Sequence, residues 1–263
     1  MLSYILKYIY FYLKAGNQHN VHSPFVYQLY TLIIQGSEEY YAFEELEKLR
    51  QELSSDRTKL EITDYGAGSK VKSKGKNSRT VSEIAHRSAI SKKKAELLFR
   101  LVEYFKPKAI LELGTSLGLS TLFIALASDN STSQIITFEG CPQIAEKANE
   151  NFEELEQDHI EIIVGNIDKT LPQTLSSLGV LDFVFLDANH RYQPTINYFH
   201  QILEKSHNET VIVLDDIHWS REMEQAWKEI IEHPKVTVSI DLFQLGLVFL
   251  RKEQAKQHFK LRF

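Results

Sequence analysis

From Lys106 onward, short apolar runs alternate with segments of helical periodicity. The apolar runs lie at 109–113, 134–138, 160–164, 181–186 and 210–214. Helical patterns follow them near 118–128, 142–155, 170–178, 194–205 and 220–232. Runs that are apolar on both faces are typical of a parallel sheet covered by helices. The alternation therefore predicts an α/β fold with a doubly wound, mostly parallel sheet.

The end of the chain departs from this alternation. Two strand-like segments, 235–243 and 246–252, are separated only by Gln244 and Leu245. A parallel crossover needs a dozen or more residues, so these two strands are expected to form an antiparallel hairpin. The sequence thus predicts a Rossmann-like sheet of seven strands with an antiparallel strand at its end.

The first ninety residues have a different pattern. Helical periodicity appears near 2–14, 22–35 and 38–53, and a further helix is expected at 92–105, where Ser91 could cap it. We therefore divide the chain into an N-terminal helical extension with a basic loop at 1–90, acting as a cap or lid, and a main domain at 91–263.

The first of these helices is apolar but short. Lys7 and Lys14 interrupt it within about one helix length, so it cannot span a bilayer, which needs about 20 apolar residues. A signal peptide is the alternative interpretation. The helical spacing of the aliphatic residues predicts a helix that covers the main domain or pairs with a second subunit, as in a homodimer through the N-terminal helices. These aliphatic residues are Leu2, Ile5, Leu6, Ile9 and Leu13.

A basic stretch lies between these helices and the main domain. From Lys70 to Lys94 it holds nine basic residues and one acid, Glu83. It is either a solvated loop or a lid that contacts an anionic substrate. Just upstream, Gly66 and Gly68 follow a strand-like run, which we interpret as a turn because no apolar helix comes after it.

Composition narrows the class of protein. With 263 residues, 43% hydrophobic and 25% charged, the chain resembles an ordinary globular protein with no transmembrane segment. The net charge of −5 gives no reason to expect a nucleic-acid partner. Cys141 is the only cysteine, so an intrachain disulfide is excluded and a cytoplasmic location is favoured.

The strongest chemical signal is the sequence AILELGTSLGLSTLFIA at 109–125. An apolar strand ends in Glu112, turns through glycines and enters a helix, whose first N–H groups have no partner within the helix. The spacing Gly114-x-x-x-Gly118 differs from the G-x-G-x-x-G of dinucleotide binders and suits the amino and carboxylate groups of a methionine moiety. The expected cofactor contacts in this segment are Glu112, Gly114, Thr115, Ser116, Gly118 and Ser120.

Two later strand ends extend this site. Glu139, followed by Gly140, ends the second strand, where a carboxylate can accept the two hydroxyls of a ribose. After the third strand, Asn166 and Ile167 are expected to contact an adenine through an amide and an aliphatic chain. Together these positions predict an adenosine-containing ligand.

Acidic residues follow the fourth and fifth strands. Asp187 ends one strand, and Asp215 and Asp216 end the next. Carboxylates that meet at the edge of a sheet suit Mg²⁺, so a metal site is one hypothesis. The alternative is that Asp187 lies near the cofactor while Asp215 and Asp216 cap a helix or hold His218. His190, beyond Asp187, could accept a proton from a hydroxyl.

Taken together, several segments resemble the class I S-adenosylmethionine-dependent methyltransferases, and within them the catechol O-methyltransferase-like group with a D-x-x-H-x-Y stretch. They are ELLFRLVEYFKPKAILELGTSLGLSTL, FEG, GNIDKTLP, LDFVFLDANHRY and VIVLDDIHW. The resemblance spans about 91–251. It implies a metal held by Asp187, Asp215 and Asp216, although this chain has Asp216 where the family has Asn, and His190 where it has a lysine base.

The expected function is S-adenosylmethionine-dependent methyl transfer to a small molecule at an oxygen, with His190 and Asp187 as catalytic residues. A protein that binds the cofactor without turnover is the alternative. The glycine spacing and the terminal hairpin both disfavour a dehydrogenase.

Overall fold

The structure is a computed structural model that describes residues 2–63 and 78–263. The described chain forms two compact units: unit 1 comprises 1–36 and 178–263, and unit 2 comprises 37–177. Gly66, Gly68 and the first four lysines of the basic stretch, Lys70, Lys72, Lys74 and Lys76, lie outside the described residues. The lid and turn interpretations therefore stay predictions, as does the domain division at residue 90.

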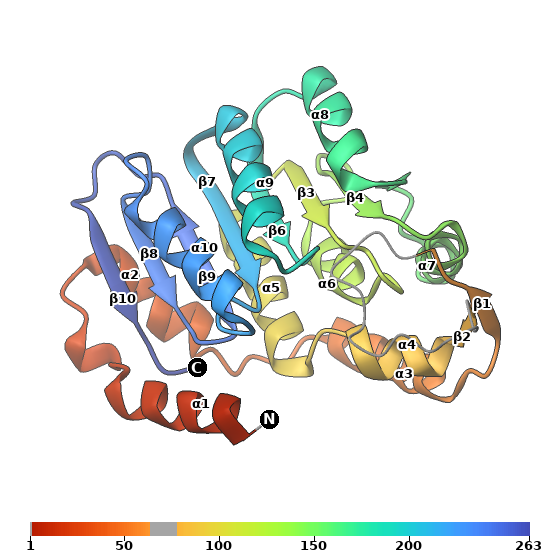
Figure 1. Ribbon diagram of the computed structural model, residues 1–263, viewed down its shortest axis with the longest axis horizontal. Helices are drawn as coiled ribbons and strands as arrows, with labels where there is room; N and C mark the ends of the chain where they lie inside the picture. The colour runs from red at the N-terminus through yellow and green to blue at the C-terminus, as the bar shows by residue number, and fades with distance from the viewer. Residues whose placement is uncertain (1, 64–77) are drawn as a thin grey trace. The chain divides into compact units, whose positions relative to one another are not determined.

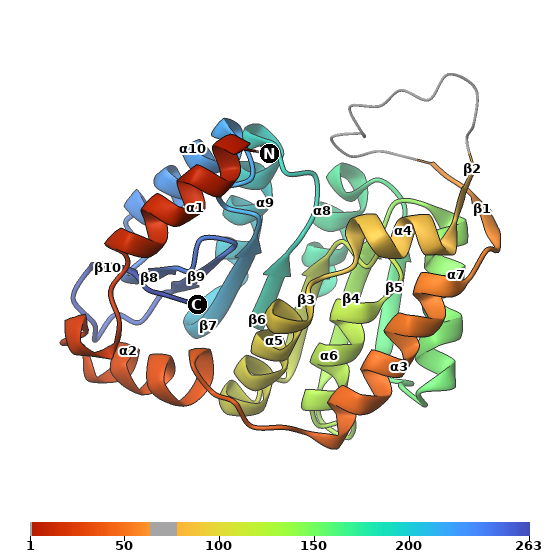
Figure 2. The same cartoon turned by 90° about the horizontal axis from the view of Figure 1, so that it is seen from below.

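Unit 2 is built on three parallel strands in the order β3-β4-β5. The buried side chains of β3 and β4 are almost all aliphatic or aromatic, as strands covered on both faces require. Helix α8 lies on one face of these strands and α5 and α6 lie on the other (Figures 1 and 2). The strands are β3 (Ala109–Leu113), β4 (Gln134–Glu139) and β5 (Ile160–Val164), with the separate hairpin β1 (Lys59–Glu61) and β2 (Ser78–Thr80). The helices are α3 (Tyr41–Ser55), α4 (Val81–Ser88), α5 (Lys92–Phe105), α6 (Leu119–Ala127), α7 (Pro142–Glu154) and α8 (Ile167–Ser177).

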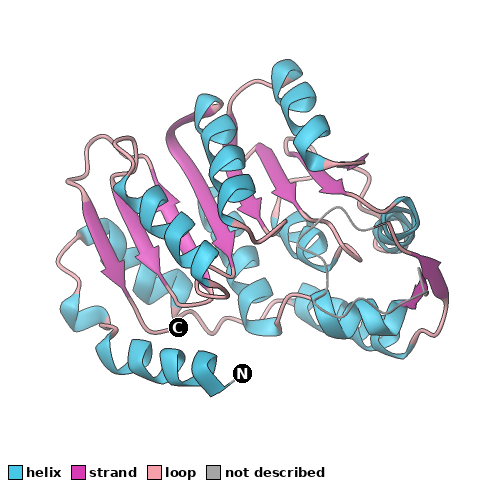
Figure 3. Ribbon diagram, in the orientation of Figure 1, coloured by secondary structure: helices cyan, strands magenta, loops and turns pink. Residues whose placement is uncertain are grey.

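Unit 1 contributes strands in the order β10-β8-β9-β7-β6. The helices α9 and α10 pack side by side on one face and α2 lies on the other (Figures 1, 2 and 3). The strands are β6 (Leu181–Leu186), β7 (Ser206–Asp215), β8 (Val238–Asp241), β9 (Leu245–Phe249) and β10 (Gln257–Lys260). The helices are α1 (Leu2–Lys14), η1 (Gln18–Asn20), α2 (Pro24–Gln28), η2 (Leu29–Ile34), α9 (Tyr192–Glu204) and α10 (Arg221–Glu232).

The predicted α/β class and the mostly parallel sheet are confirmed, with two corrections. The described residues contribute eight strands to the main sheet, not seven, because β10 pairs in parallel with β8. Its four residues are mostly exposed, so no apolar run marked it in the sequence. The hairpin of β8 and β9 is antiparallel as predicted, but the antiparallel strand β9 lies between β7 and β8 and not at the end of the sheet.

Helix α5 has the predicted bounds, but its expected cap is absent. Ser91 occupies the N-cap position without a hydrogen bond from its side chain to the helix. The preceding helix α4 was not predicted, although its sequence carries a capping box: the Thr80 hydroxyl accepts the Glu83 N–H, and the Glu83 carboxylate accepts the Thr80 N–H.

Helix α1 packs on unit 1 through its aromatic side. The rings of Tyr4, Tyr8 and Phe11 surround Phe243, with centroid distances of 5.1, 5.1 and 5.3 Å. Ile5, Leu6, Ile9 and Leu13 are exposed, so these residues do not cover the domain as expected, and pairing with a second subunit stays a prediction. Both sides of this helix are apolar, and the aromatic side offers the larger contact area. Among the described residues, no helix has the length and hydropathy needed to cross a membrane.

Candidate functional site

The turn from β3 into α6 can be made only with glycine at two places. Gly114 has φ of 106° and Gly118 has φ of 81°, both in the left-handed region. A Cβ on Gly118 would also overlap the ring of Phe152 from α7. The N–H groups of Gly114 and Thr115 both donate to the Phe138 carbonyl on β4, at 3.1 and 3.0 Å. Backbone conformation and close packing therefore fix the shape of this turn.

Beneath the turn lies the fully buried carboxyl group of Glu112. It accepts hydrogen bonds from Ser120 (2.6 Å), Thr137 (2.8 Å) and Thr121, so it ties β3 to both α6 and β4. A polar group with no exposed surface is stable only when it is hydrogen-bonded, and hydroxyl donors satisfy this one. Glu112 therefore holds the turn in place from below.

The hydroxyl of Thr115 belongs to the same network. Thr137 has one hydroxyl hydrogen, which it donates to Glu112, so Thr115 must be the donor across the 2.7 Å contact between the two threonines. The side chains of Thr115 and Ser120 are buried and engaged within the protein. Cofactor contacts from Glu112, Thr115 and Ser120 stay predictions, because the side chains of all three, and the backbone N–H and carbonyl of Thr115, already have partners within the protein.

Glu139 at the end of β4 is joined directly to the turn. Its Oε2 accepts the Ser116 N–H and its Oε1 accepts the Cys141 N–H, each at 2.9 Å. Ser116 itself has a left-handed φ of 48°, which turns its N–H toward the carboxylate. The structure thus brings the two strongest predicted cofactor-binding features together, with the second strand end beside the glycine turn.

The third predicted contact region also meets Glu139. The Gly165 N–H donates to the Glu139 carbonyl at 2.9 Å, and Gly165 has φ of 139°. Asn166 then begins α8: its Oδ1 accepts the Asp168 N–H at 2.9 Å. This capping bond fixes the amide plane of Asn166 and places Ile167 in the first turn of α8. The positions predicted to contact methionine, ribose and adenine groups are thus linked by backbone bonds within unit 2.

In unit 1, the segment after β6 adopts a strained turn. Asn189 and His190 have φ of 64° and 30°, and the His190 N–H donates to the Ala188 carbonyl at 2.9 Å. Left-handed conformations at residues other than glycine cost about 1–3 kcal/mol each and concentrate at functional sites. The turn carries the His190 imidazole back to Asp187, with Nε2 3.4 Å from Oδ1.

The acids around His190 make it a cation at neutral pH. Burial disfavours the charged imidazole, but the hydrogen bond and charge of Asp187, with the charges of Asp216 and Asp215, outweigh burial and raise the pKa of His190 to about 9. In this state the imidazole donates protons and does not accept them. His190 is therefore a counter-ion of the predicted acid group.

The segment after β7 differs from the alternative prediction. Asp215 is buried and accepts the Asp216 N–H at 2.7 Å, and Asp216 has φ of 55°. Helix α10 is capped by Ser220, so these acids do not cap it. They do not hold His218 either.

Asp241 on β8 holds His218 at 2.9 Å, and Glu224 lies 3.5 Å from the other ring nitrogen. Asp241 is fully buried and was missed by sequence reasoning. It stands within a strand-like run and follows no motif, and the only signal was its charge among apolar neighbours.

The predicted metal ligands have suitable chemistry but not a suitable arrangement. Three carboxylates are hard oxygen donors of the kind Mg²⁺ prefers. Across the described residues, however, no group of three or more His, Cys, Asp or Glu side chains is placed to hold a metal ion. The residues as arranged do not fit the ion.

The raised pKa of His190 makes a testable prediction. The stability that the charged imidazole contributes should be complete below pH 6.5 and should be lost as pH rises through about 9, since the folded pKa lies above the unfolded one. An NMR titration of the His190 ring should give a pKa near 9, and a clearly lower pKa in Asp187→Asn. Asp182→Asn, which removes the partner of His207, is the control and should leave the His190 value unchanged. A wild-type pKa near 6.5 would contradict the assignment.

The segments that carry the candidate site also match known proteins. Residues 111–217 match the model of a family described as a methyltransferase domain. A protein of Mycobacterium tuberculosis called catechol O-methyltransferase is 30% identical over 132 residues, which are 50% of this chain and 58% of that protein. One of the same name from Niastella koreensis is 31% identical over 131 residues, or 49% and 58% of the two chains. The chain thus matches less than two thirds of the length of these relatives.

Solved structures agree on the fold. A methyltransferase of Podospora anserina, bound to S-adenosylhomocysteine (SAH), superposes with a TM-score of 0.59 at 14% identity, covering 88% of this chain and 97% of that one. An O-methyltransferase of Bacillus cereus, also in complex with SAH, gives 0.58 at 20% identity, covering 85% and 96%. The predicted resemblance to the catechol O-methyltransferase-like group and the Rossmann-like fold class are both confirmed.

Proposed function

We propose that this chain is an S-adenosylmethionine-dependent methyltransferase that acts on an oxygen of a small molecule. One observation carries the proposal: the Ser116 N–H bond to Glu139 joins a glycine turn at a helix N-terminus to a carboxylate at the next strand end. This juxtaposition places a carboxylate that could accept ribose hydroxyls beside the N-terminus of α6, whose first N–H groups have no acceptor within the helix. The names of the matched relatives support the same chemistry.

Each part of the cofactor has a proposed partner. The turn from Gly114 to Gly118 would bind the methionine end through its backbone, where a helix N-terminus favours the carboxylate. Glu139 would accept the ribose hydroxyls, and Gly140 would allow close approach beside it. Asn166 and Ile167 would contact the adenine, with the amide Nδ2 of Asn166 as donor because its Oδ1 caps α8.

The acceptor chemistry is assigned to Asp187 and His190. Methyl transfer needs a nucleophilic oxygen in line with the sulfonium methyl, and most of the rate gain comes from that alignment. With a pKa of about 9, His190 would donate a hydrogen bond to an acceptor oxygen that has already lost its proton to solvent, and so stabilise that anion; only the deprotonated imidazole would itself accept the hydroxyl proton. Asp187 would hold the imidazole in position.

Three finer predictions are retained here. The acceptor is proposed to be a small molecule, and the relatives' names make a catechol the first compound to test. Self-association through the N-terminal helices and a cytoplasmic location stay predictions. A Mg²⁺ site is the competing hypothesis that the chelator experiment tests, because its expected ligands do not form a group in the part of the chain that is described.

The cofactor assignment predicts the effect of two substitutions. Gly114→Val and Glu139→Ala should each weaken S-adenosylmethionine binding at least about tenfold, because one blocks backbone approach and the other removes a two-hydroxyl contact. Isothermal titration measures both. Glu146→Ala, an exposed acid on α7, is the matched loss of charge and should bind as the wild type does. If both variants fold and keep full affinity, the cofactor binds elsewhere.

The mechanism is tested by a chelator and a histidine variant assayed with one methylated substrate, beginning with a catechol. Because the carboxylates are not arranged as a metal site, we expect activity to persist in EDTA. His190→Ala should lose at least about a hundredfold in kcat. Loss of activity in EDTA, its return with Mg²⁺, and inactivity of Asp215→Asn would instead establish the metal mechanism and leave His190 as a positioning residue.

A further inference from the structure

The outward side of α1 is apolar along its whole length. Successive residues are rotated by about 100°, so the exposed hydrophobic side chains of α1, apart from Tyr8 which also packs on Phe243, form one arc of about 160°. The arc contains Tyr12, Ile5, Ile9, Leu13, Leu6 and Tyr10, in order around the helix. Leu13 is 73% exposed and Tyr10 is 64% exposed. A surface helix of a globular protein normally turns charged residues to this side, so the arc requires a partner.

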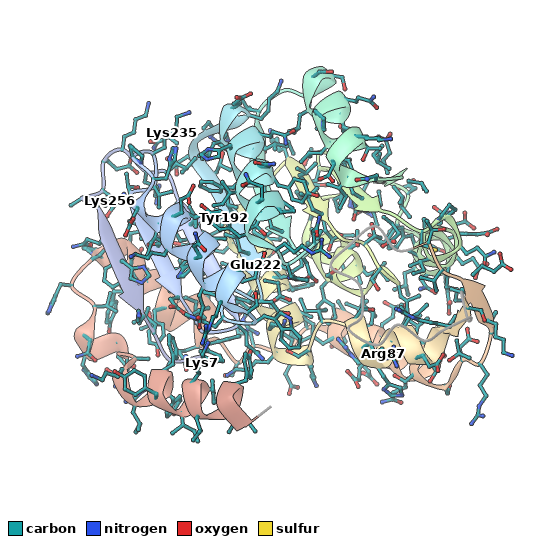
Figure 4. All side chains as sticks on the ribbon, viewed as in Figure 1. Lys7, Arg87, Tyr192, Glu222, Lys235 and Lys256 are labelled. Atoms are coloured by element: carbon teal, nitrogen blue, oxygen red, sulfur yellow. The ribbon has the colours of Figure 1, made fainter. Side chains whose placement is uncertain are left out.

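The structure holds the helix with this arc outward. On the inner side, Tyr4 and Phe11 pack on Phe243, and the ammonium of Lys7 lies 2.8 Å from the Glu224 carboxylate. Figure 2 shows α1 running along the outside of unit 1, and Figure 4 shows Lys7 on the side of the helix toward α10.

The end of α1 is also tied down by the C-terminal segment. The Gly16 N–H donates to the Lys260 carbonyl at 2.8 Å, and the Arg262 N–H donates to the Gly16 carbonyl at 3.0 Å. Contacts at the inner side and at the end of the helix therefore both keep the arc exposed. The orientation of the helix is fixed before any partner binds.

The arc has a graded chemical character. Its centre is aliphatic, formed by Ile5, Ile9 and Leu13 with Leu6, and a tyrosine lies at each edge. Each tyrosine is accompanied by a cation: the Lys14 ammonium lies 5.3 Å from the centre of the Tyr10 ring, and the Arg262 guanidinium lies 4.9 Å from that of Tyr12. The helix itself contains no acidic residue. The face is therefore an aliphatic strip bordered by phenols and positive charges.

We propose that α1 docks unit 1 onto the surface of a membrane that contains anionic lipids. Thirteen residues make a helix about 20 Å long, too short to span a bilayer but suited to lie in its interface. The aliphatic strip enters the acyl boundary, the tyrosines lie at the headgroup level, and Lys14 and Arg262 meet the lipid phosphates.

Charge complementarity favours lipid over a second copy of the chain. Two such helices packed face to face, parallel or antiparallel, offer no carboxylate from either helix to Lys14 or Arg262 of the other. A parallel pair would bring these cations together in a partly desolvated contact, and an antiparallel pair would leave each of them without a carboxylate from the partner helix; both arrangements cost free energy. An anionic bilayer matches both the aliphatic strip and its positive border. Docking at a membrane surface goes beyond the proposed methyl transfer and does not depend on it.

Co-sedimentation of the full chain with lipid vesicles tests the proposal without any activity assay. The wild type should bind vesicles of equal parts phosphatidylglycerol and phosphatidylcholine, and bind pure phosphatidylcholine more weakly. Leu6→Glu and Leu13→Glu should each weaken this partitioning at least about tenfold. The control is Val180→Glu, which places the same charge on an equally exposed apolar residue just before β6 and should bind normally.

A charge variant distinguishes electrostatic attraction to anionic lipids from nonspecific hydrophobic adsorption to any vesicle. Lys14→Gln should reduce binding to the anionic vesicles about fivefold and leave binding to phosphatidylcholine unchanged. Circular dichroism confirms that each variant is folded. Absence of binding by the wild type overturns the proposal. A dimer seen by light scattering, lost in Leu13→Glu and unaffected by vesicles, would also overturn it and assign the face to a second copy.

Discussion

The buried carboxyl group of Glu112 is the interaction on which the candidate cofactor site depends. It gathers hydroxyls from α6 and β4 beneath the end of β3, so the strand, the helix and the neighbouring strand meet at one point. Removing this carboxyl group would leave its buried hydroxyl partners unsatisfied. The cost is about 1–3 kcal/mol for each stranded group. The shape of the turn above it is set by this network and by the close packing of Gly118 on Phe152.

The loops around Asp187 and Asp216 in unit 1 differ from the cofactor turn in backbone conformation and in charge. Around Asp187 and Asp216 the backbone adopts left-handed conformations at three residues that are not glycine, and the acids there are balanced by the His190 imidazolium. Such strain must be offset by the rest of the fold, and the β7–β9–β8 strands with α9 and α10 provide the supporting core. The cofactor turn uses glycine at two of its three left-handed positions, with Ser116 as the third, whereas the acid and histidine loops have no glycine at theirs and store more strain.

Much of the fold followed from the sequence because parallel strands and amphipathic helices have distinct periods. All seven expected strands are present, and α1 and α5 have the expected bounds. Strand β10 could not be predicted because three of its four residues are polar and exposed, and its pairing is set by tertiary contact. The orientation of α1 could not be read from its period either, since both sides are apolar and tertiary contacts, among them the packing on Phe243 and the Lys7–Glu224 ion pair, select one.

The sequence predicted which segments of the candidate site would lie together, but not the contacts that their side chains make. A carboxylate at a strand end can bind a ligand or can accept hydrogen bonds from the rest of the chain, and the sequence does not distinguish these two roles. Glu139 accepts a bond from the glycine turn, whereas Glu112 is enclosed by hydroxyl donors. Asp241 was missed because a strand position carries no motif, yet it holds His218.

The central claim is that the turn at 114–118 and Glu139 hold an adenosine-containing methyl donor and not a dinucleotide. Isothermal titration of the wild-type chain with SAH and, separately, with NADH tests it most directly. Saturable binding of SAH with no binding of NADH is the predicted result. Binding of NADH alone, or of neither compound, by the folded chain would contradict the account.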